Sequence, residues 1–478
     1  MFSSKAKVLL INPTFDVVRQ LGEWGKLYVR GRPLGLGHLA AYLESKTRET
    51  RVIDGQISEL TEENLSKEIE ELSPNIVGIT STTALASAAH EVAKWVKNIS
   101  KDVKVVMGGV HPTVLPGETL EDDNVDVVVR GEGEITFFEL VRTFETGANL
   151  GNVLGVSFKD DGEIVHNVNR PFIEDLDSLP LVSDHILPIK LYDGYGILTA
   201  RGCPFNCIFC SSRTLWGTRY RVRSPENVFV EIDSIVNKYN PKEIAFIDES
   251  FVINKKRTEK ICNMFIERGY HKKISWACSS RADLIDEPVL EKMREAGCNA
   301  ISFGIETASQ RLLDVLKKRT SPEINERAVR MAKKAGISNV RATFILGIPT
   351  ETREESLATI KYAKKLPLDS AKFSIATPYP GTELYRVALS EGMNIPKDWS
   401  KLHQGVGFSE YDPLYIPKGR DAGELKRLQK RAHLEFYLSL RHILYISRIW
   451  DISWKGIKSW KDIRMYWRIA KSLFMRRE

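Results

Sequence analysis

Three cysteines on one short segment carry the most distinctive chemistry of the chain. Cys203, Cys207 and Cys210 follow a C-x3-C-x2-C spacing. Thiolates are soft ligands that suit iron–sulfur clusters, and three on one loop can bind three irons of a [4Fe–4S] cluster. No fourth cysteine lies nearby, so the spacing predicts a cluster whose fourth iron stays open to a small molecule.

Two other uses of these thiols are less well supported. A structural zinc site normally takes four ligands, often as two C-x-x-C pairs, and the chain has no second pair. A disulfide framework is not favoured by 6 cysteines in 478 residues without a recognisable secretory signal. We therefore expect the three cysteines to bind a metal cluster.

The cysteine motif resembles that of radical S-adenosylmethionine (SAM) enzymes. In that family the open iron binds the amino and carboxylate groups of SAM, and reductive cleavage gives a 5′-deoxyadenosyl radical that abstracts hydrogen. Phe209 matches the aromatic residue that the family usually has before the last cysteine. The resemblance implies a catalytic role for the cluster and a reductase, flavodoxin or ferredoxin as electron donor.

Polar residues that follow two expected strands are candidates for binding SAM. Asp248 and Glu249 stand where the family orients the SAM amino group, and a carboxylate can accept hydrogen bonds from an ammonium. Ser280 and Arg281 follow the next strand, and an arginine can make a two-pronged contact with a carboxylate. A helix N-cap for the acids and an ion pair for the arginine are the structural alternatives.

Three further candidates follow the later strands. Glu306 would accept hydrogen bonds from the ribose hydroxyls or the amine of SAM. Gly347 would let the adenine approach the backbone. Tyr379, in a Tyr-Pro-Gly-Thr run after the last strand, is a candidate catalytic residue.

The elements that must position these residues alternate between strand and helix from residue 195 to 400. Apolar runs at 196–200, 243–247, 275–278, 300–304, 341–345 and 372–377 are separated by helical patterns. They resemble the partial (β/α)6 barrel of radical SAM enzymes. Parallel barrels carry their active sites at the carboxyl ends of the strands, where all of these candidates fall.

Residues 1–150 show a second alternation of strands and helices. Short β-branched runs separated by helical patterns predict a doubly wound, Rossmann-like parallel sheet, which binds ligands beyond the carboxyl ends of its strands. No G-x-G-x-x-G occurs there, so a dinucleotide site is poorly supported. The cofactor-binding candidates at the strand ends are Asn12, Thr80, Ser81, Thr82, Gly108, Gly109, His111, Thr113, Gly131 and Glu132.

This first segment resembles the cobalamin-binding domain that precedes many radical SAM enzymes. The Gly-Gly-Val-His-Pro-Thr run at 108–113 and the Arg-Gly-Glu-Gly-Glu run at 130–134 carry the resemblance. The D-x-H-x-x-G motif that supplies a cobalt-binding histidine is absent, so His111 is expected to be a loop contact. Related domains have also lost the cofactor, and that alternative stays open.

The remaining segments are an expected linker at 151–194 and an expected helical region at 401–478. Residues 426–478 carry 14 Lys/Arg against 4 Asp/Glu, with Trp450, Trp454, Trp460 and Trp467 interleaved. Basic helices rich in tryptophan are typical of membrane surfaces, although packing on the barrel is an alternative. RNA binding is less well supported because no recognised RNA module accompanies the tail. We expect a cytoplasmic protein, with contact to a membrane surface through this tail.

Together these features predict an enzyme in which a cobalamin domain faces a radical SAM barrel. The resemblance implies C-methylation of an unactivated carbon, with an apolar or lipid-like small molecule as the substrate. A cobalamin-associated ring-forming or ring-contracting reaction uses the same cofactors and remains the first alternative. A non-catalytic cluster or cobalamin sensor is the second.

Overall fold

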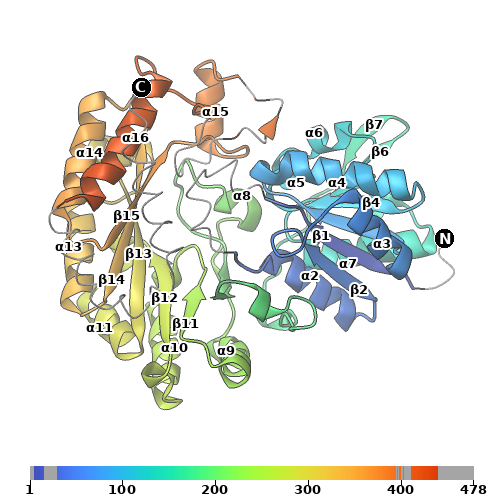
Figure 1. Ribbon diagram of the computed structural model, residues 1–478, viewed down its shortest axis with the longest axis horizontal. Helices are drawn as coiled ribbons and strands as arrows, with labels where there is room; N and C mark the ends of the chain where they lie inside the picture. Colours follow the sequence, from blue (N-terminus) through green and yellow to red (C-terminus); the bar gives the residue numbers. More distant parts are fainter. Residues whose placement is uncertain are drawn as a thin grey trace, which may run out of the picture.

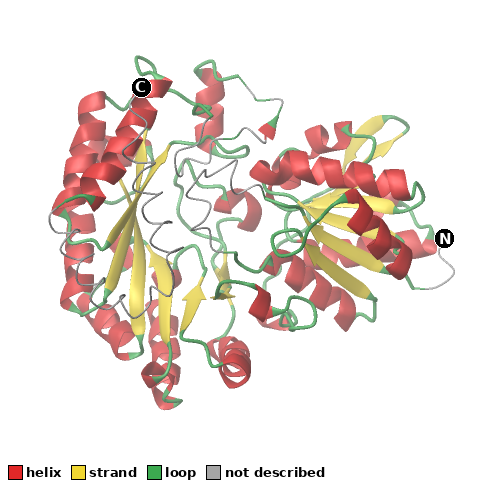
Figure 2. Cartoon of the chain, viewed as in Figure 1, coloured by secondary structure: helices red, strands yellow, loops and turns green. Residues whose placement is uncertain are grey.

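The computed structural model describes residues 5–15, 30–394, 396, 398, 399, 402 and 411–439. Two α/β bodies lie side by side (Figure 1). Each is built around one sheet that is parallel over most of its width, with helices along its faces (Figure 2). This is the fold class that the sequence predicts.

The first sheet has seven strands in the order β2-β1-β3-β4-β5-β6-β7. Its first five strands are parallel, and β6 and β7 are antiparallel additions at one edge. The strands are β1 (Val8–Asn12), β2 (Thr50–Asp54), β3 (Ile76–Thr80), β4 (Lys104–Gly108), β5 (Val127–Val129), β6 (Val156–Asp160) and β7 (Glu163–His166). The helices are α2 (Leu34–Ser45), α3 (Glu62–Leu72), α4 (Ala86–Ile99), α5 (Val110–Val114), α6 (Pro116–Glu121) and α7 (Gly133–Thr146).

Both faces of this sheet are buried, because its central strands are apolar over most of their length. β1 is buried throughout its length, and its alternate side chains enter two separate cores. Leu10 packs in the core that includes residues of α2 and α7, whereas Leu9 packs in the core that includes residues of α3 and α4. Continuous apolar strands of this kind are typical of doubly wound sheets.

The hairpin of β6 and β7 moves one boundary that the sequence suggests. β6 pairs with β5, and β7 pairs with β6, so the first sheet continues to His166. The segment expected to be a linker from residue 151 therefore contributes its first part to the first body, and the connection between the bodies begins after residue 166.

The second sheet has six strands, all parallel, in the order β15-β14-β13-β12-β11-β8. The strands are β8 (Tyr195–Ile197), β11 (Glu243–Phe246), β12 (Ser275–Ser280), β13 (Cys298–Glu306), β14 (Asn339–Leu346) and β15 (Ser370–Ile375). The helices are α8 (Ser212–Trp216), α9 (Pro225–Tyr239), α10 (Lys255–Glu267), α11 (Glu287–Glu295), α12 (Gln310–Val315), α13 (Pro322–Lys334), α14 (Arg353–Lys365), α15 (Glu383–Ser390) and α16 (Ala422–Tyr437).

A two-stranded ribbon stands between β8 and α9. It pairs β9 (Ala200–Arg201) with β10 (Arg221–Val222) in an antiparallel register, with Arg201 opposite Arg221. The chain between these two residues forms one loop, and that loop carries all three cysteines of the motif.

Helix α16 covers the free edge of the barrel sheet. The Tyr437 hydroxyl exchanges hydrogen bonds with the backbone of Ala371, at 3.0 Å to its oxygen and 3.3 Å to its nitrogen. Gln429 donates to the Phe373 carbonyl at 2.9 Å, and the Phe373 N–H points to His433 at 3.5 Å. Side chains of a helix therefore occupy backbone groups of β15 that a neighbouring strand would otherwise bind.

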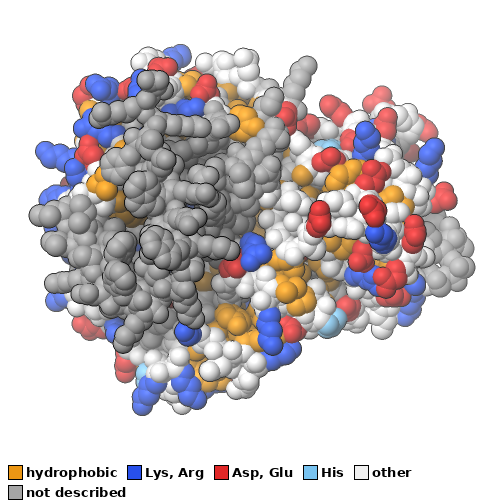
Figure 3. All heavy atoms as spheres, viewed as in Figure 1, with side chains coloured by type: hydrophobic (Ala, Val, Ile, Leu, Met, Phe, Trp, Pro, Cys, Tyr) orange, Lys and Arg blue, Asp and Glu red, His pale blue; other side chains and the backbone are white. Residues whose placement is uncertain are grey.

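The tryptophan-rich tail, with Trp450, Trp454, Trp460 and Trp467, lies outside the described residues. None of the helices in the described part is long and apolar enough to cross a bilayer. On the first body, the face in Figure 3 carries charges of both signs, interspersed rather than gathered in one patch.

Candidate functional site

The three cysteines lie on the loop between β9 and α8, beyond the end of the first barrel strand. All three thiols are partly buried. The loop turns at Gly202, whose φ of +89° suits glycine, and a Cβ there would stand 2.1 Å from the Arg219 carbonyl oxygen. The Cys210 N–H donates to the Cys207 carbonyl at 3.2 Å, which folds the last two cysteines into a turn.

The surroundings of the thiols suit a cationic cluster. Burial raises the pKa of Cys203, and burial raises that of Cys210 to about 12. These groups are therefore protonated thiols unless a positive centre replaces the proton, which is what bound iron does. Within the described ranges, no group of three His, Cys, Asp or Glu side chains is placed so that it could bind a single metal ion. A cluster shared among three thiolates on one loop fits this donor set.

Arg281 lies beside the cysteines, and its guanidinium is bound by neighbouring side chains. Its guanidinium donates to the Cys207 sulfur at 3.6 Å and makes two bonds of 2.9 Å to the Asp283 carboxylate. It also stacks on Phe205, 3.8 Å from the ring centroid. The structure thus places Arg281 against a cluster ligand, with Asp283 holding it there.

Asp248 and Glu249 have different surroundings. Asp248 is buried and accepts hydrogen bonds from the Thr199 N–H at 2.6 Å and the Ala200 N–H at 3.1 Å, which secures the start of β9. Glu249 is exposed, and its charge contributes to the raised pKa of both Cys203 and Cys210. Glu249 is therefore the acid of this pair that faces the cysteine loop.

Glu306 forms a buried ion pair with Lys318 at 2.7 Å. It has a φ of +67°, where a non-glycine residue is strained, and it follows a register shift at the end of β13. Burial disfavours the Lys318 ammonium, but the charges of Glu306 and Cys207 outweigh it and raise its pKa. Lys318 was not among the sequence candidates, because its place beside Glu306 depends on how α12 folds back.

Ser280, Gly347 and Phe209 also lie on this rim. The Ser280 hydroxyl is buried, 3.5 Å from that of Ser250. Gly347 has a φ of +74°, and its N–H donates to the Glu351 carboxylate, which also accepts from Ile348 at 3.1 Å. Glu351 is a further residue that the sequence reasoning missed. Phe209 packs beside the apolar cluster of Ile208, Leu312, Leu316, Ile348, Ala376 and Leu384.

The edge of the first sheet is built by three loops that bind one another. The His111 N–H donates to the Ser81 carbonyl at 3.1 Å, and the Gly131 N–H donates to the Thr113 hydroxyl at 3.0 Å. Gly109 has a φ of +100°, and a Cβ there would meet the Ser81 oxygen at 2.7 Å. The loops after β3, β4 and β5 therefore form one surface, as expected for a ligand-binding sheet edge.

Several groups on this edge are accessible from outside the sheet. Thr82 is exposed, and the space around the missing Cβ of Gly131 is open. Thr80, Gly108 and Gly109 stand beside them with partial exposure. This edge fits a cobalamin held by backbone and hydroxyl groups.

His111 and Asn12 point elsewhere. His111 is fully buried, neither ring nitrogen has a hydrogen-bond partner among the residues that the structure describes, and burial lowers its pKa to about 4. Its ring packs edge-on against Trp399, with centroids 5.6 Å apart. Asn12 donates to Asp54 at 2.7 Å, and the other oxygen of Asp54 accepts from Tyr192 at 2.8 Å. His111 is thus an internal contact, and Asn12 belongs to a buried hydrogen-bond chain.

Glu132 binds arginines of the barrel body. It accepts hydrogen bonds from Arg201 and Arg221, and all three side chains are buried. Its carboxylate is therefore occupied in the contact between the bodies.

The two sheet edges meet at this contact. Thr214 on α8, directly after the cysteines, donates to the Gly381 carbonyl at 3.1 Å. A Cβ on Gly381 would stand 2.7 Å from the Val114 side chain, which belongs to α5 of the first body. Tyr379 packs beside Ala86 and Tyr385 at the same contact, and burial raises its pKa to about 12. The loops after β4, β9 and β15 therefore converge.

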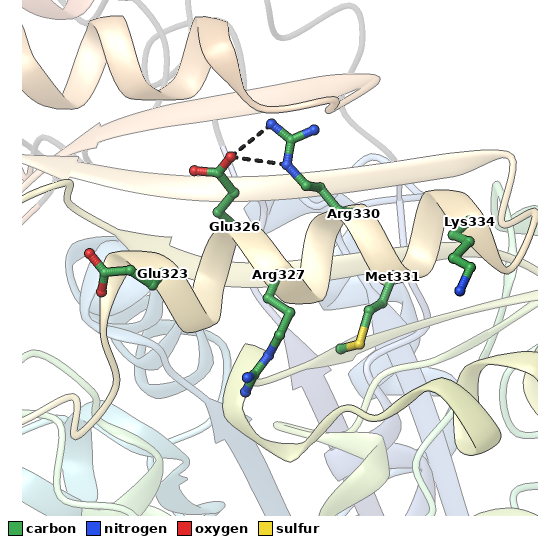
Figure 4. A pocket seen from close by; sticks show the side chains of 6 residues that line it. All are labelled: Glu323, Glu326, Arg327, Arg330, Met331 and Lys334. Atoms are coloured by element: carbon green, nitrogen blue, oxygen red, sulfur yellow. Dashed lines mark hydrogen bonds and ion pairs between the residues drawn. The ribbon is translucent and has the colours of Figure 1, made fainter.

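A hollow on the outer face of α13 lies apart from this site. Its lining comes from that one helix, and the Glu326–Arg330 ion pair lies along one side of the helix (Figure 4). The residues that line it are Glu323, Glu326, Arg327, Arg330, Met331 and Lys334. It contains none of the candidate residues and belongs to the surface of the barrel.

Comparison with known proteins agrees with this geometry. Residues 197–363 match the model of the radical SAM superfamily, and residues 25–141 match that of the B12 binding domain. The chain is 39% identical over 437 residues to an uncharacterized methyltransferase, PH0819, of Pyrococcus horikoshii, covering 90% of this chain and 92% of that protein. The chain belongs to the radical SAM superfamily. It is an enzyme of the group that carries a cobalamin-binding domain and uses SAM, a [4Fe–4S] cluster and cobalamin.

Other relatives differ in the reaction that their names state. An anaerobic magnesium-protoporphyrin IX monomethyl ester cyclase of Cereibacter sphaeroides is 33% identical, over 81% of this chain and 63% of that protein. A cytidylyl-2-hydroxyethylphosphonate methyltransferase of Streptomyces wedmorensis is 28% identical, over 82% and 83%. Among solved structures, the methyltransferase TsrM of Kitasatospora setae, with cobalamin and a [4Fe–4S] cluster bound, has the same fold at a TM-score of 0.70 and 19% identity, over 82% and 76%.

Proposed function

We propose that this enzyme methylates an unactivated carbon of a small molecule. The observation that carries the proposal is the convergence of the two sheet edges, which places the cysteine loop against the cobalamin-binding edge through Thr214, Gly381 and Val114. When bound, a reduced cluster would supply the electron that cleaves SAM, and methylcobalamin would supply the methyl group. The chain itself must hold these groups close together and exclude water from them.

Each residue has a proposed role in that arrangement. Cys203, Cys207 and Cys210 bind the cluster, and Arg281 stabilises the Cys207 thiolate by a charge-assisted hydrogen bond. We assign Glu249 to the SAM amino group, because it is the acid that faces the cysteine loop. Glu306 is held by Lys318 on the same rim, and Gly347 leaves space for the adenine.

The inner face of the barrel suggests the kind of substrate. Ile247 exposes about half of its surface there, 51%. Lys372 and Arg341 alternate along their strands with core residues, so they lie on the inner face as well. Lys372 is exposed on that face and has no acidic partner among the described residues. We therefore propose a substrate with an apolar part and an acidic group, which includes lipid-like acids.

The first test is cofactor content. Protein purified without oxygen from cells supplied with iron and cobalamin should contain about four irons and one corrinoid per chain. Four irons without corrinoid would contradict the methylcobalamin mechanism. The second test incubates the reduced enzyme with SAM carrying a deuterated methyl group and candidate acids.

Methyl transfer and ring formation give different mass spectra in this second test. A product that gains the deuterated methyl group supports methylation. A product that loses hydrogen without gaining methyl, with 5′-deoxyadenosine formed, would favour the cyclase reaction of the Cereibacter relative. A full cluster that forms no 5′-deoxyadenosine would favour a sensor.

A further inference from the structure

The cysteine loop has a stem made of two arginines. The loop spans residues 202–220, and it begins and ends at Arg201 and Arg221, which face each other across the β9–β10 ribbon. Both side chains are buried, at 3% and 4% exposure. Like charges directly opposite on paired strands repel each other, so this stem needs a counter-charge.

The counter-charge comes from the other body of the molecule. Glu132 lies between the arginines, with one oxygen 2.9 Å from Arg201 and 2.8 Å from Arg221. Its second oxygen is 2.9 Å from Arg221 and accepts from the Ile173 N–H at 2.6 Å. Glu132 thus neutralises both sides of the stem at once.

Glu134 completes the cluster of four charges. It accepts from the second nitrogen of Arg201 at 2.6 Å, so each terminal nitrogen of that guanidinium bonds to a different glutamate. Burial alone would raise the pKa of Glu134, but Arg201 outweighs it and lowers that pKa. The guanidinium of Arg201 also stacks on Trp216 of α8, 4.9 Å from the ring centroid. Two carboxylates and two guanidiniums therefore form a buried, neutral group.

We propose that Glu132 and Glu134 are positioning residues, which clamp the stem of the cysteine loop to the cobalamin-binding body and so set the separation of the two cofactors. This inference depends on the proposed function in one respect, which is that each of the two sheet edges holds a reacting group. Buried ion pairs add little net stability compared with apolar packing, but their geometry is demanding. A network of this kind therefore fixes the relative position of the two bodies more than it adds to the stability of their contact.

The test compares hydrogen–deuterium exchange in the reconstituted full-length enzyme and its Glu132→Gln variant. The variant leaves two buried guanidiniums facing each other with one counter-charge, so amide exchange in residues 202–220 should rise by about tenfold or more. Glu134→Gln keeps Glu132 between the arginines and should give a smaller rise in the same segment. It also provides the readout if Glu132→Gln does not fold.

Asp369→Asn is the matched control. Asp369 is a buried carboxylate of the barrel, paired with Lys333 at 2.5 Å, and its partners lie in the barrel body. This variant should lose stability without a selective rise in exchange at 202–220. Equal rises over the whole chain in the Glu132 and Asp369 variants, or a loop that stays protected in both glutamate variants, would overturn the clamp.

A spectroscopic readout separates positioning from folding. The electron paramagnetic resonance spectrum of the reduced cluster with SAM should change in Glu132→Gln and not in Asp369→Asn, whereas an unchanged spectrum would count against the clamp. Neither measurement needs methyl transfer. A localised rise in exchange in the glutamate variants, together with no methylation by the parent enzyme, would support the clamp and reject the proposed function. Methylation by the parent enzyme, together with a loop that stays protected in the variants, would support the proposed function and reject the clamp.

Discussion

Gly202 is the residue on which the cysteine loop turns. A Cβ at this position would lie 2.1 Å from the Arg219 carbonyl oxygen, and Gly202 directly follows the paired residue Arg201 of the ribbon. We predict that Gly202→Ala lowers the iron bound after reconstitution at least about fivefold, because the loop must shift to relieve the overlap.

The control for this change is Gly269→Ala. Gly269 also has a positive φ, of 67°, but no heavy atom lies within 4 Å of the position that a Cβ would take. Both variants therefore carry the backbone strain, and only the first carries the overlap. Equal iron content in the two variants would contradict the assignment.

Lys318 is the second residue whose environment makes a strong prediction. Replacing it by methionine leaves Glu306 buried without its cation, and breaking a buried pair costs about 3–5 kcal/mol. Urea unfolding should show a loss of that order for Lys318→Met, and adding Glu306→Gln should recover most of it. A double variant no more stable than the single one would show that the pair does not account for the cost.

At this scale the sequence points directly to the cysteines and says little about their surroundings. Cys203, Cys207 and Cys210 are recognisable because their spacing within one loop is itself the signal. Lys318 and Glu351 gave no such signal, since each acquires its role from a residue that folding brings beside it. Glu132 was expected to bind cofactor, but a local motif could not show that its partners are Arg201 and Arg221, 69 and 89 positions away.

The loop after β4 is the element with the clearest dependence on pH. Burial lowers the pKa of His111 to about 4, although the Glu118 carboxylate is 3.6 Å away, whereas an unfolded histidine has a pKa of about 6.5. Between these values the unfolded chain binds a proton that the folded chain does not. Stability should therefore fall as the pH is lowered from about 6.5 to about 4, by up to roughly 3 kcal/mol.

His111→Phe isolates this contribution, because it keeps a ring against Trp399 and removes the titrating group. Thermal unfolding between pH 4 and 7 should give a flatter profile for the variant than for the parent chain. Identical profiles would show that other groups, such as the buried His38, account for the acid sensitivity.

Strand and helix positions are the best-predicted level of this molecule. The alternation of apolar runs with helical patterns located the parallel strands of both sheets, because each is buried on both faces and leaves a continuous signal. The β6–β7 hairpin was assigned to a linker, since two antiparallel strands at a sheet edge look like any surface hairpin in sequence. They belong to the first sheet because β6 pairs with β5, and this pairing is not visible in the sequence.

At the scale of the whole molecule, the contact between the two bodies has a charged part that is buried. Arg201, Arg221, Glu132 and Glu134 are each less than one-tenth exposed. Salt screens charges that water reaches, and it screens buried pairs much less. We predict that exchange protection of residues 202–220 is unchanged between about 0.1 and 0.5 M salt.

Exposed pairs provide the internal comparison for that experiment. Lys67–Glu63 on α3 is largely exposed and should contribute less as salt increases. Loss of protection in the cysteine loop at high salt would mean that water enters the contact and that the bodies separate readily.

The covering of β15 by α16 has a consequence for how the barrel stays open. A six-stranded sheet that does not close has two edge strands, here β8 and β15, and in most proteins such an edge is short or charged. Here Gln429 and Tyr437 fill part of the β15 edge with side-chain partners. Helix α16 thereby protects the β15 edge of a barrel that does not close. A chain cut before residue 422 would expose the unpaired backbone groups of β15. We expect such a chain to form oligomers by pairing through this edge.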